Sequence, residues 1–192
     1  MNPNSIRIID KYLGRPICFG LTIMRKVFPA RKAGKPSSIL FLKLVEQGAT
    51  VLAYSALQKA IDQVGRENVY FCLFKENRPI LDIMDVIPKE NVIEIRMSNI
   101  FIFAIDVLKL LIRCRSEKVD TTIDMEFFSR AAAILAYLSG ARTRVGLHRF
   151  KSELPYRGDL MTMARKFYRD TPSYRTSKRY FLNPSAIPLN VY

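Results

Sequence analysis

The stretch FLKLVEQGATVLAYSAL, residues 41–57, changes its pattern at Gly48. Residues 38–45 are a short apolar run, which is typical of a strand covered on both faces. Residues 50–64 then place apolar and small side chains at helical spacing. A glycine between a strand and a helix often serves phosphate binding or catalysis. This turn has no second or third glycine, and a carboxylate, Glu46, precedes it.

The alternation of apolar runs and helical segments continues along the chain. The patterns predict further strands at 68–74, 91–96, 118–124 and 143–147, and helices at 78–85, 98–116 and 128–140. Strands that alternate with helices form a parallel sheet with right-handed crossovers. The expected fold class is therefore α/β, with a Rossmann-like parallel sheet flanked by helices over residues 38–160.

Residues 1–37 are expected to form a basic amphipathic helix followed by a linker. Within 5–28, apolar side chains recur every three or four positions, at Ile9, Leu13, Ile17, Leu21, Met24 and Phe28. Gly14 and Pro16 should kink or divide this helix. Because basic residues flank the apolar face, one interpretation places the helix on an anionic lipid surface. The other packs the helix on the domain.

The net charge of +14 is concentrated at the two ends of the chain. Residues 1–36 carry +7 and residues 141–192 carry +8, whereas the middle is close to neutral. Such basic ends attract phosphates or anionic lipid. Residues 161–192 show no sustained period, and we expect an irregular tail there that marks a truncation point.

The location and the metal content can also be predicted. The longest N-terminal apolar run, 16–24, is shorter than the roughly 20 residues of a membrane-spanning helix, and no secretory cleavage site is seen. Three dispersed cysteines favour a reducing compartment. We expect a cytoplasmic protein, peripheral on the inner face of the cell membrane, that uses no metal and no cofactor.

Polar residues gather where the predicted strands end, and ligands of open parallel sheets bind at that edge. The acceptor-binding candidates are Gln47, Gly48, Thr50, Asn77, Asp124, Arg130, His148 and Arg157. Glu46 and Glu126 are the candidates for a general base, because a carboxylate can accept the proton of a sugar hydroxyl. Arginines can bind phosphate through paired hydrogen bonds. Any one of these acids could instead cap a helix, as Asp124 could, or form half of a salt bridge.

Several stretches, in the same order along the chain, resemble glycosyltransferase family 9, the heptosyltransferase family of lipopolysaccharide synthesis. The quoted segments are ILFLKLVEQGATVLAYSALQKAI, FKENRPILD, TTIDMEFFSRAAAILAYLSGA, TRVGLHRF and ELPYRGDL. The N-terminal RIIDKYLGRPICF also looks like an extension carried by some members. The resemblance covers roughly residues 5–160.

The resemblance implies a two-domain GT-B enzyme, of which this chain is the N-terminal, acceptor-binding half. Transfer would be inverting, metal-free and dependent on a nucleotide sugar bound by a second domain. The partners would be a glycan or lipid-linked sugar acceptor and, where the second domain is present, the donor. The family's proposed base is an aspartate after the turn glycine, but Ala49 stands here. Glu46 is the first substitute and Glu126 the second.

Two alternatives remain open. The chain could be a non-catalytic basic α/β module that binds RNA or anionic lipid, or an inactive remnant of a transferase. Aromatic and arginine side chains can stack on bases, but the tyrosines of this sequence are not interleaved on a predicted sheet face. Nucleic acid is therefore not the expected partner.

Overall fold

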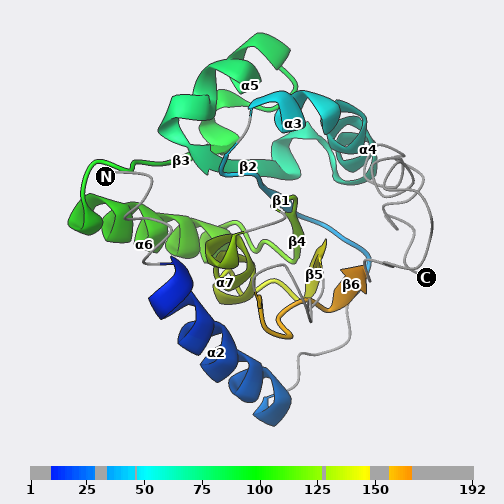
Figure 1. Ribbon diagram of the computed structural model, residues 1–192. Coiled ribbons are helices and arrows are strands. Elements are labelled where there is room, and N and C mark those ends of the chain that lie inside the picture. Colours follow the sequence, from blue (N-terminus) through cyan, green and yellow to red (C-terminus); the bar gives the residue numbers. More distant parts are fainter. Residues whose placement is uncertain (1–9, 29–33, 46, 127–128, 148–155, 166–192) are drawn as a thin grey trace, which may run out of the picture.

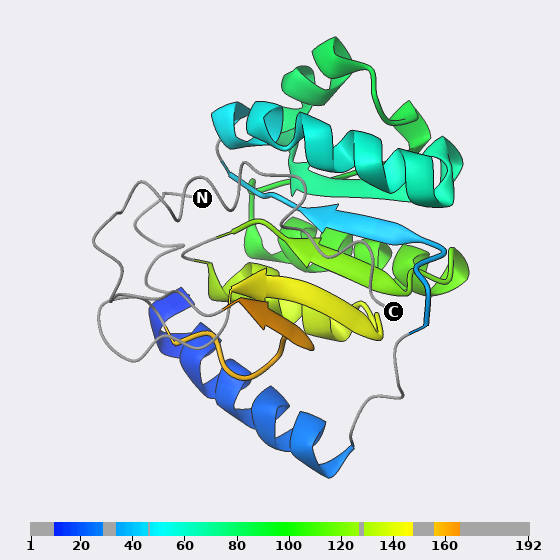
Figure 2. The same ribbon diagram turned by 90° about the vertical axis from the view of Figure 1, so that its right-hand side faces the viewer.

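The computed structural model describes residues 10–28, 34–45, 47–126, 129–147 and 156–165. Within these ranges, six parallel strands form one sheet in the order β3-β2-β1-β4-β5-β6 (Figure 1). Figure 2 shows their arrowheads pointing the same way. The strands are β1 Ile39–Leu42, β2 Val69–Phe74, β3 Val92–Ile95, β4 Thr121–Asp124, β5 Thr143–Leu147 and β6 Met163–Arg165. The expected α/β Rossmann-like class is confirmed.

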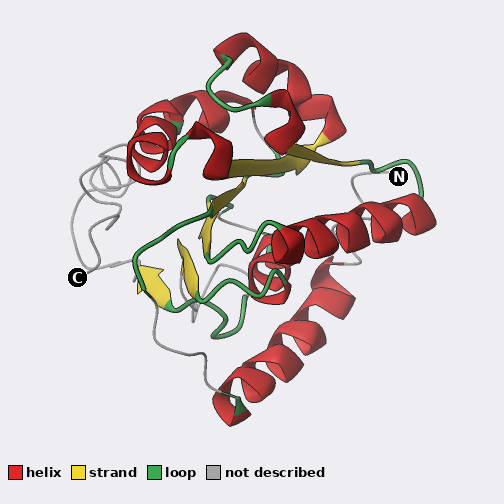
Figure 3. Ribbon diagram, turned by 180° about the vertical axis from the view of Figure 1, so that it is seen from behind, coloured by secondary structure: helices red, strands yellow, loops and turns green. Residues whose placement is uncertain are grey.

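Helices cover both faces of the sheet (Figure 3). One face carries α3 Gln47–Leu52, α4 Tyr54–Val64 and α5 Arg78–Met84, and the other carries α6 Ile100–Ser116, α7 Arg130–Leu138 and the N-terminal α2 Arg15–Val27. The helix predicted at 50–64 is divided, because the regular helix is interrupted at Ala53 between α3 and α4.

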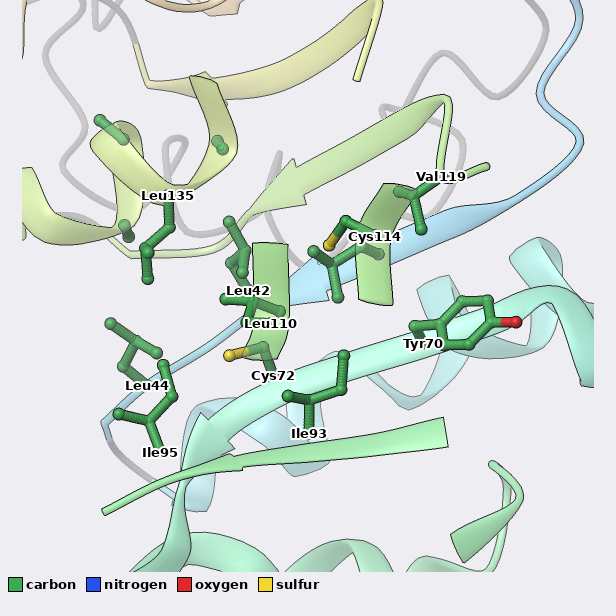
Figure 4. Close-up of a cluster of buried hydrophobic side chains, with 14 of the residues drawn as sticks. Leu42, Leu44, Tyr70, Cys72, Ile93, Ile95, Leu110, Cys114, Val119 and Leu135 are labelled. Carbon is green, nitrogen blue, oxygen red and sulfur yellow. The ribbon is translucent and has the colours of Figure 1, made fainter. Parts of the chain in front are cut away.

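Strand β1 is buried on both faces, as its continuous apolar run predicts. Ile39 and Phe41 belong to the core beneath α4, and the Phe41 ring stacks on Phe71 with centroids 6.2 Å apart. Leu40 and Leu42 belong to the core beneath α6 and α7 (Figure 4). The alternation follows from the two-residue period of a strand.

The N-terminal helix divides near Gly14 and Pro16, as the sequence indicates. A π-helical segment covers Asp10–Gly14, and α2 then begins with Pro16 in its first turn. Arg130 fastens this junction, since its Nη1 donates to Asp10 Oδ2 at 2.6 Å.

The two sides of α2 have different environments, since one packs on the domain and the other is exposed. The side with small residues packs on the domain, where Cys18 and Thr22 are buried. Gly158, at φ +70°, lies so close that an added Cβ would come within 2.8 Å of the Cys18 carbonyl oxygen. Most of the predicted apolar side is exposed instead, at Leu13, Ile17, Met24 and Phe28.

Helix α6 is apolar on both its inner and outer sides. Leu110 and Cys114 are buried, and the carboxylate Asp106 points inward to Arg96. Ile105, Leu108 and Ile112 face outward, together with Phe101. Because a helix has only one face toward its own core, the periodicity could not tell which apolar side would be covered.

The sixth strand was not predicted. β6 pairs with β5 in parallel register, with Val145 opposite Met163. The folded domain therefore extends past residue 160, the predicted boundary, to at least residue 165. The rest of the predicted tail lies outside the described residues.

Candidate functional site

The order of the strands reverses between β1 and β4. From β1 the chain moves outward to β2 and β3, and it then returns to place β4 on the other side of β1. In open parallel sheets, ligands bind beyond the carboxyl ends of the strands at such a switch point. The residues that follow β1 and β4, 43–45 and 125–126, therefore define the candidate site.

Glu126 joins the ends of these two strands. Its Oε1 accepts the backbone N–H groups of Leu44 and Val45, each at 2.9 Å. The same oxygen lies 3.4 Å from Nζ of Lys43, and both side chains are buried. Glu126 thus holds the backbone that leads into the β1–α3 turn. These contacts suit a positioning residue, and a catalytic role for Glu126 stays a prediction.

Asp124 and Arg157 form a buried ion pair behind this point. Arg157 Nη2 contacts Asp124 Oδ2, Nη1 donates to the Glu126 carbonyl at 2.7 Å and Nε to the Ser129 carbonyl at 2.9 Å. Asp124 Oδ1 accepts the N–H of Glu126. Burial raises the pKa of Asp124, while the Arg157 cation opposes that rise. Asp124 and Arg157, which were both predicted to bind the acceptor, therefore bind each other.

Helix α7 has its own cap. Ser129 Oγ accepts the N–H of Ala132, so Asp124 does not cap this helix as the sequence suggested it could. Arg130, another predicted acceptor residue, binds Asp10 and donates from Nε to the Tyr156 carbonyl at 2.9 Å. Its role in the described part of the chain is to join α7 to the N-terminal helix.

The other predicted residues surround the β1–α3 turn. Asn77 donates from Nδ2 to the Leu44 carbonyl at 2.7 Å, and so supports the same backbone as Glu126. Thr50 is buried, whereas Gly48 is exposed and an added Cβ there would meet nothing within 4 Å. Gln47 begins α3. Glu46 and His148 lie outside the described residues.

A hollow of about 480 Å³ opens at the carboxyl ends of β2 and β3. It is lined by Lys75, Glu76, Arg96, Met97 and Ser98. Arg96 is held by Asp106 through N–H groups at 2.9 and 2.8 Å. The candidate residues did not include Arg96, although it is the last residue of the third predicted strand and so lies at the end of the sheet where ligands bind.

The described residues show no cluster of three metal-ligating side chains. Within the same ranges, every helix is too short or too polar to cross a bilayer. The three cysteines are buried and free, and burial raises the pKa of the Cys18 and Cys114 thiols to about 11. None of these thiols is therefore a ready nucleophile.

Comparisons with known proteins give a structural match but no sequence match. No protein-family model matches this sequence, and no curated protein matches it. Among solved structures, the chain is similar to "the glycosyl transferase family 9 from Veillonella parvula DSM 2008", with a TM-score of 0.56 and 12% sequence identity. The match covers 81% of this chain and 42% of that one. The likeness supports the expected fold, and the chain spans less than half of the protein it matches.

Proposed function

We propose that this chain is the acceptor-binding half of an inverting, nucleotide-sugar-dependent glycosyltransferase that builds lipopolysaccharide or another cell-surface glycan. The observation that supports the proposal is the fold likeness to a family 9 glycosyltransferase across 81% of the chain. In this proposal the nucleotide-sugar donor binds only where a second domain is present.

The switch point between β1 and β4 is the proposed place of the acceptor hydroxyl. Glu126 and Asn77 both fix the backbone at Leu44, directly before the turn that carries Glu46. In this proposal Glu46 takes the hydroxyl proton as general base, and Glu126 acts through the turn as a positioning residue. The acceptor oxygen attacks the anomeric carbon, and the nucleotide diphosphate leaves with the bonding electron pair. The donor domain stabilises that charge.

The test of this function is binding of an acceptor by the chain itself. Calorimetric titration should show that deacylated lipopolysaccharide core saccharide binds, whereas a nucleotide sugar such as ADP-heptose does not. Glu46→Gln should bind the saccharide with nearly unchanged affinity, because the change removes a proton acceptor but leaves a hydrogen-bonding group. Absence of saccharide binding by the wild-type chain would refute the proposal.

The proposed location is the inner face of the cytoplasmic membrane, with α2 as the lipid-binding element. Support comes from the outward side of α2, where Phe19 and Val27 are 59% and 63% exposed. Arg15 and Lys26 are exposed on the same helix, and its neighbouring carboxylate, Asp10, is paired with Arg130. An apolar face with a basic border and, among the described residues of this helix, no unpaired acid suits an anionic lipid surface.

A further inference from the structure

A second hollow, of about 220 Å³, lies where α2, α6 and α7 end. Its lining includes three cations from three different elements: Arg25 in the last turn of α2, Arg115 in the last turn of α6, and Arg144 in β5. The lining contains no acidic side chain in the described part of the chain. The hollow lies at the amino end of β5, which is the opposite edge of the sheet from the proposed acceptor site.

Arg144 is buried, and its hydrogen bonds leave one nitrogen unused. Its Nε donates to the Leu160 carbonyl at 2.7 Å and its Nη1 to the Ala141 carbonyl at 2.5 Å. Its Nη2 is buried and has no partner among the described residues. The guanidinium carbon lies 5.1 Å from the centre of the Tyr137 ring, which fixes the plane of the group. Bonds to backbone carbonyls therefore account for two of its nitrogens but not the third.

The positive charge around the hollow is only partly compensated. Arg25 is the one of the three that has a carboxylate partner within the described ranges, with Nη1 2.7 Å from Asp159 Oδ1. Arg115 is exposed and reaches the Leu138 carbonyl only at 3.5 Å. Burial, and then the neighbouring Arg25 cation, lower the pKa of Arg144. A buried donor without an acceptor is costly, and the Arg144 side chain that carries it lines the hollow.

We propose that this hollow binds a phosphate group. Guanidinium groups recognise phosphate through several hydrogen bonds in fixed geometry. The volume is smaller than that of sites for drug-sized ligands, about 300–1,000 Å³, and it suits a small anion. Phe28 and Met24 line the same hollow and are exposed members of the α2 apolar side. The phosphate could therefore be that of a lipid headgroup or of a soluble phosphate ester.

The inference is independent of the transferase activity, and its test uses the whole chain in a phosphate-free buffer. Inorganic phosphate and glycerol 3-phosphate are titrated by calorimetry. In parallel, flotation is measured with vesicles of phosphatidylcholine alone and with phosphatidic acid added. Arg115→Gln is the main variant, because Arg115 is exposed and makes only one long hydrogen bond. Arg142→Gln is the matched control, since Arg142 is exposed nearby, does not line the hollow and carries the same charge.

We expect Arg115→Gln to weaken phosphate binding about tenfold, as loss of a hydrogen bond to a charged group predicts, and Arg142→Gln to leave it nearly unchanged. Arg144→Lys should also weaken phosphate binding, because a lysine keeps the positive charge but lacks the paired N–H donors of a guanidinium group. Binding of the soluble phosphates assigns the site to a phosphate ester, and binding of phosphatidic acid vesicles alone assigns it to a lipid headgroup. Binding of neither probe, or equal binding by the Arg115 and Arg142 variants, would overturn the proposal.

Discussion

The two edges of this sheet use charge in opposite ways. At the carboxyl edge, the buried carboxylates are matched by cations: Asp124 by Arg157, Glu126 by Lys43, and Asp106 by Arg96. At the amino edge, Arg25, Arg115 and Arg144 line a hollow, and in the described part of the chain only Arg25 has a carboxylate partner, Asp159. Net charge alone therefore does not locate a binding site. A carboxylate and a cation that pair with each other hold the backbone in place. A cation without a carboxylate partner can instead bind an anionic ligand.

Removing Arg157 should lower the free energy of unfolding more than any other change proposed here. The variant tests whether the carboxyl edge of the sheet depends on its carboxylate–cation pairs. Arg157→Ala leaves Asp124 buried without its partner, and breaking a buried pair in this way costs about 3–5 kcal/mol. Urea unfolding at pH 7 measures the loss in the free energy of unfolding. The double variant Asp124→Asn with Arg157→Met should be less destabilised than Arg157→Ala, since no buried charge is stranded. A loss below about 1 kcal/mol would mean that the edge does not rely on this pair.

Loss of the Asp106–Arg96 pair should lower the free energy of unfolding by an intermediate amount that depends on pH. Hydrogen bonds from Arg96 lower the pKa of Asp106 from 3.8 to about 2. A carboxyl group with a lowered pKa in the folded state stabilises the protein above its unfolded pKa. That stability is lost as the pH falls through the folded value, here from about 4 toward 2. Asp106→Asn should cost about 2 kcal/mol at pH 7, and the difference from wild type should shrink over this window.

The control for that prediction is Asp82→Asn. Asp82 pairs with Arg78 at 2.8 Å but is 41% exposed in its side chain. An exposed pair contributes about 0–1 kcal/mol. If the Asp106 variant showed the same small and pH-independent loss as the Asp82 variant, the Arg96 pair would not stabilise the fold.

The smallest change in stability is expected on the outward side of α2. Phe19→Ser combined with Ile23→Ser should alter the free energy of unfolding by no more than about 0.5 kcal/mol per site, as exposed positions do. The same double variant should weaken flotation with anionic vesicles by about tenfold or more, because each apolar side chain loses its burial in lipid. Ile83→Ser, at an 80% exposed position on α5 across the sheet, is the control and should not affect flotation. Equal loss in both variants would exclude α2 as a specific lipid contact.

The sequence predicted the architecture well because periodicity reports burial directly. Strand β1 is a continuous apolar run, and such a run needs cover on both faces, so the two helical layers followed from it. The division of the N-terminal helix near Gly14 and Pro16 could likewise be predicted, because it depends only on the conformational preferences of those two residues. Strand β6 was missed because three residues, Met163–Arg165, are too few to show a period.

The roles of the candidate site residues could not be predicted in the same way. The sequence placed Asp124 and Arg157 at one edge, but it could not show that they would meet each other, because their contact joins residues 33 positions apart. For helix α6 the sequence could not show which side would face the core, since both its inner and outer sides are apolar. Arg144 gave no signal at all, because its importance comes from a buried nitrogen left over after folding.

The most direct test of the account is to map where an acceptor binds. Backbone amide shifts of the isotope-labelled chain would be followed by NMR during titration with deacylated lipopolysaccharide core saccharide. The account predicts that the largest shifts occur at the switch point, at residues 43–48 and 125–126, and that Arg115→Gln leaves them unchanged. Shifts confined to the amino-edge hollow, or no shifts at saturating saccharide, would contradict it.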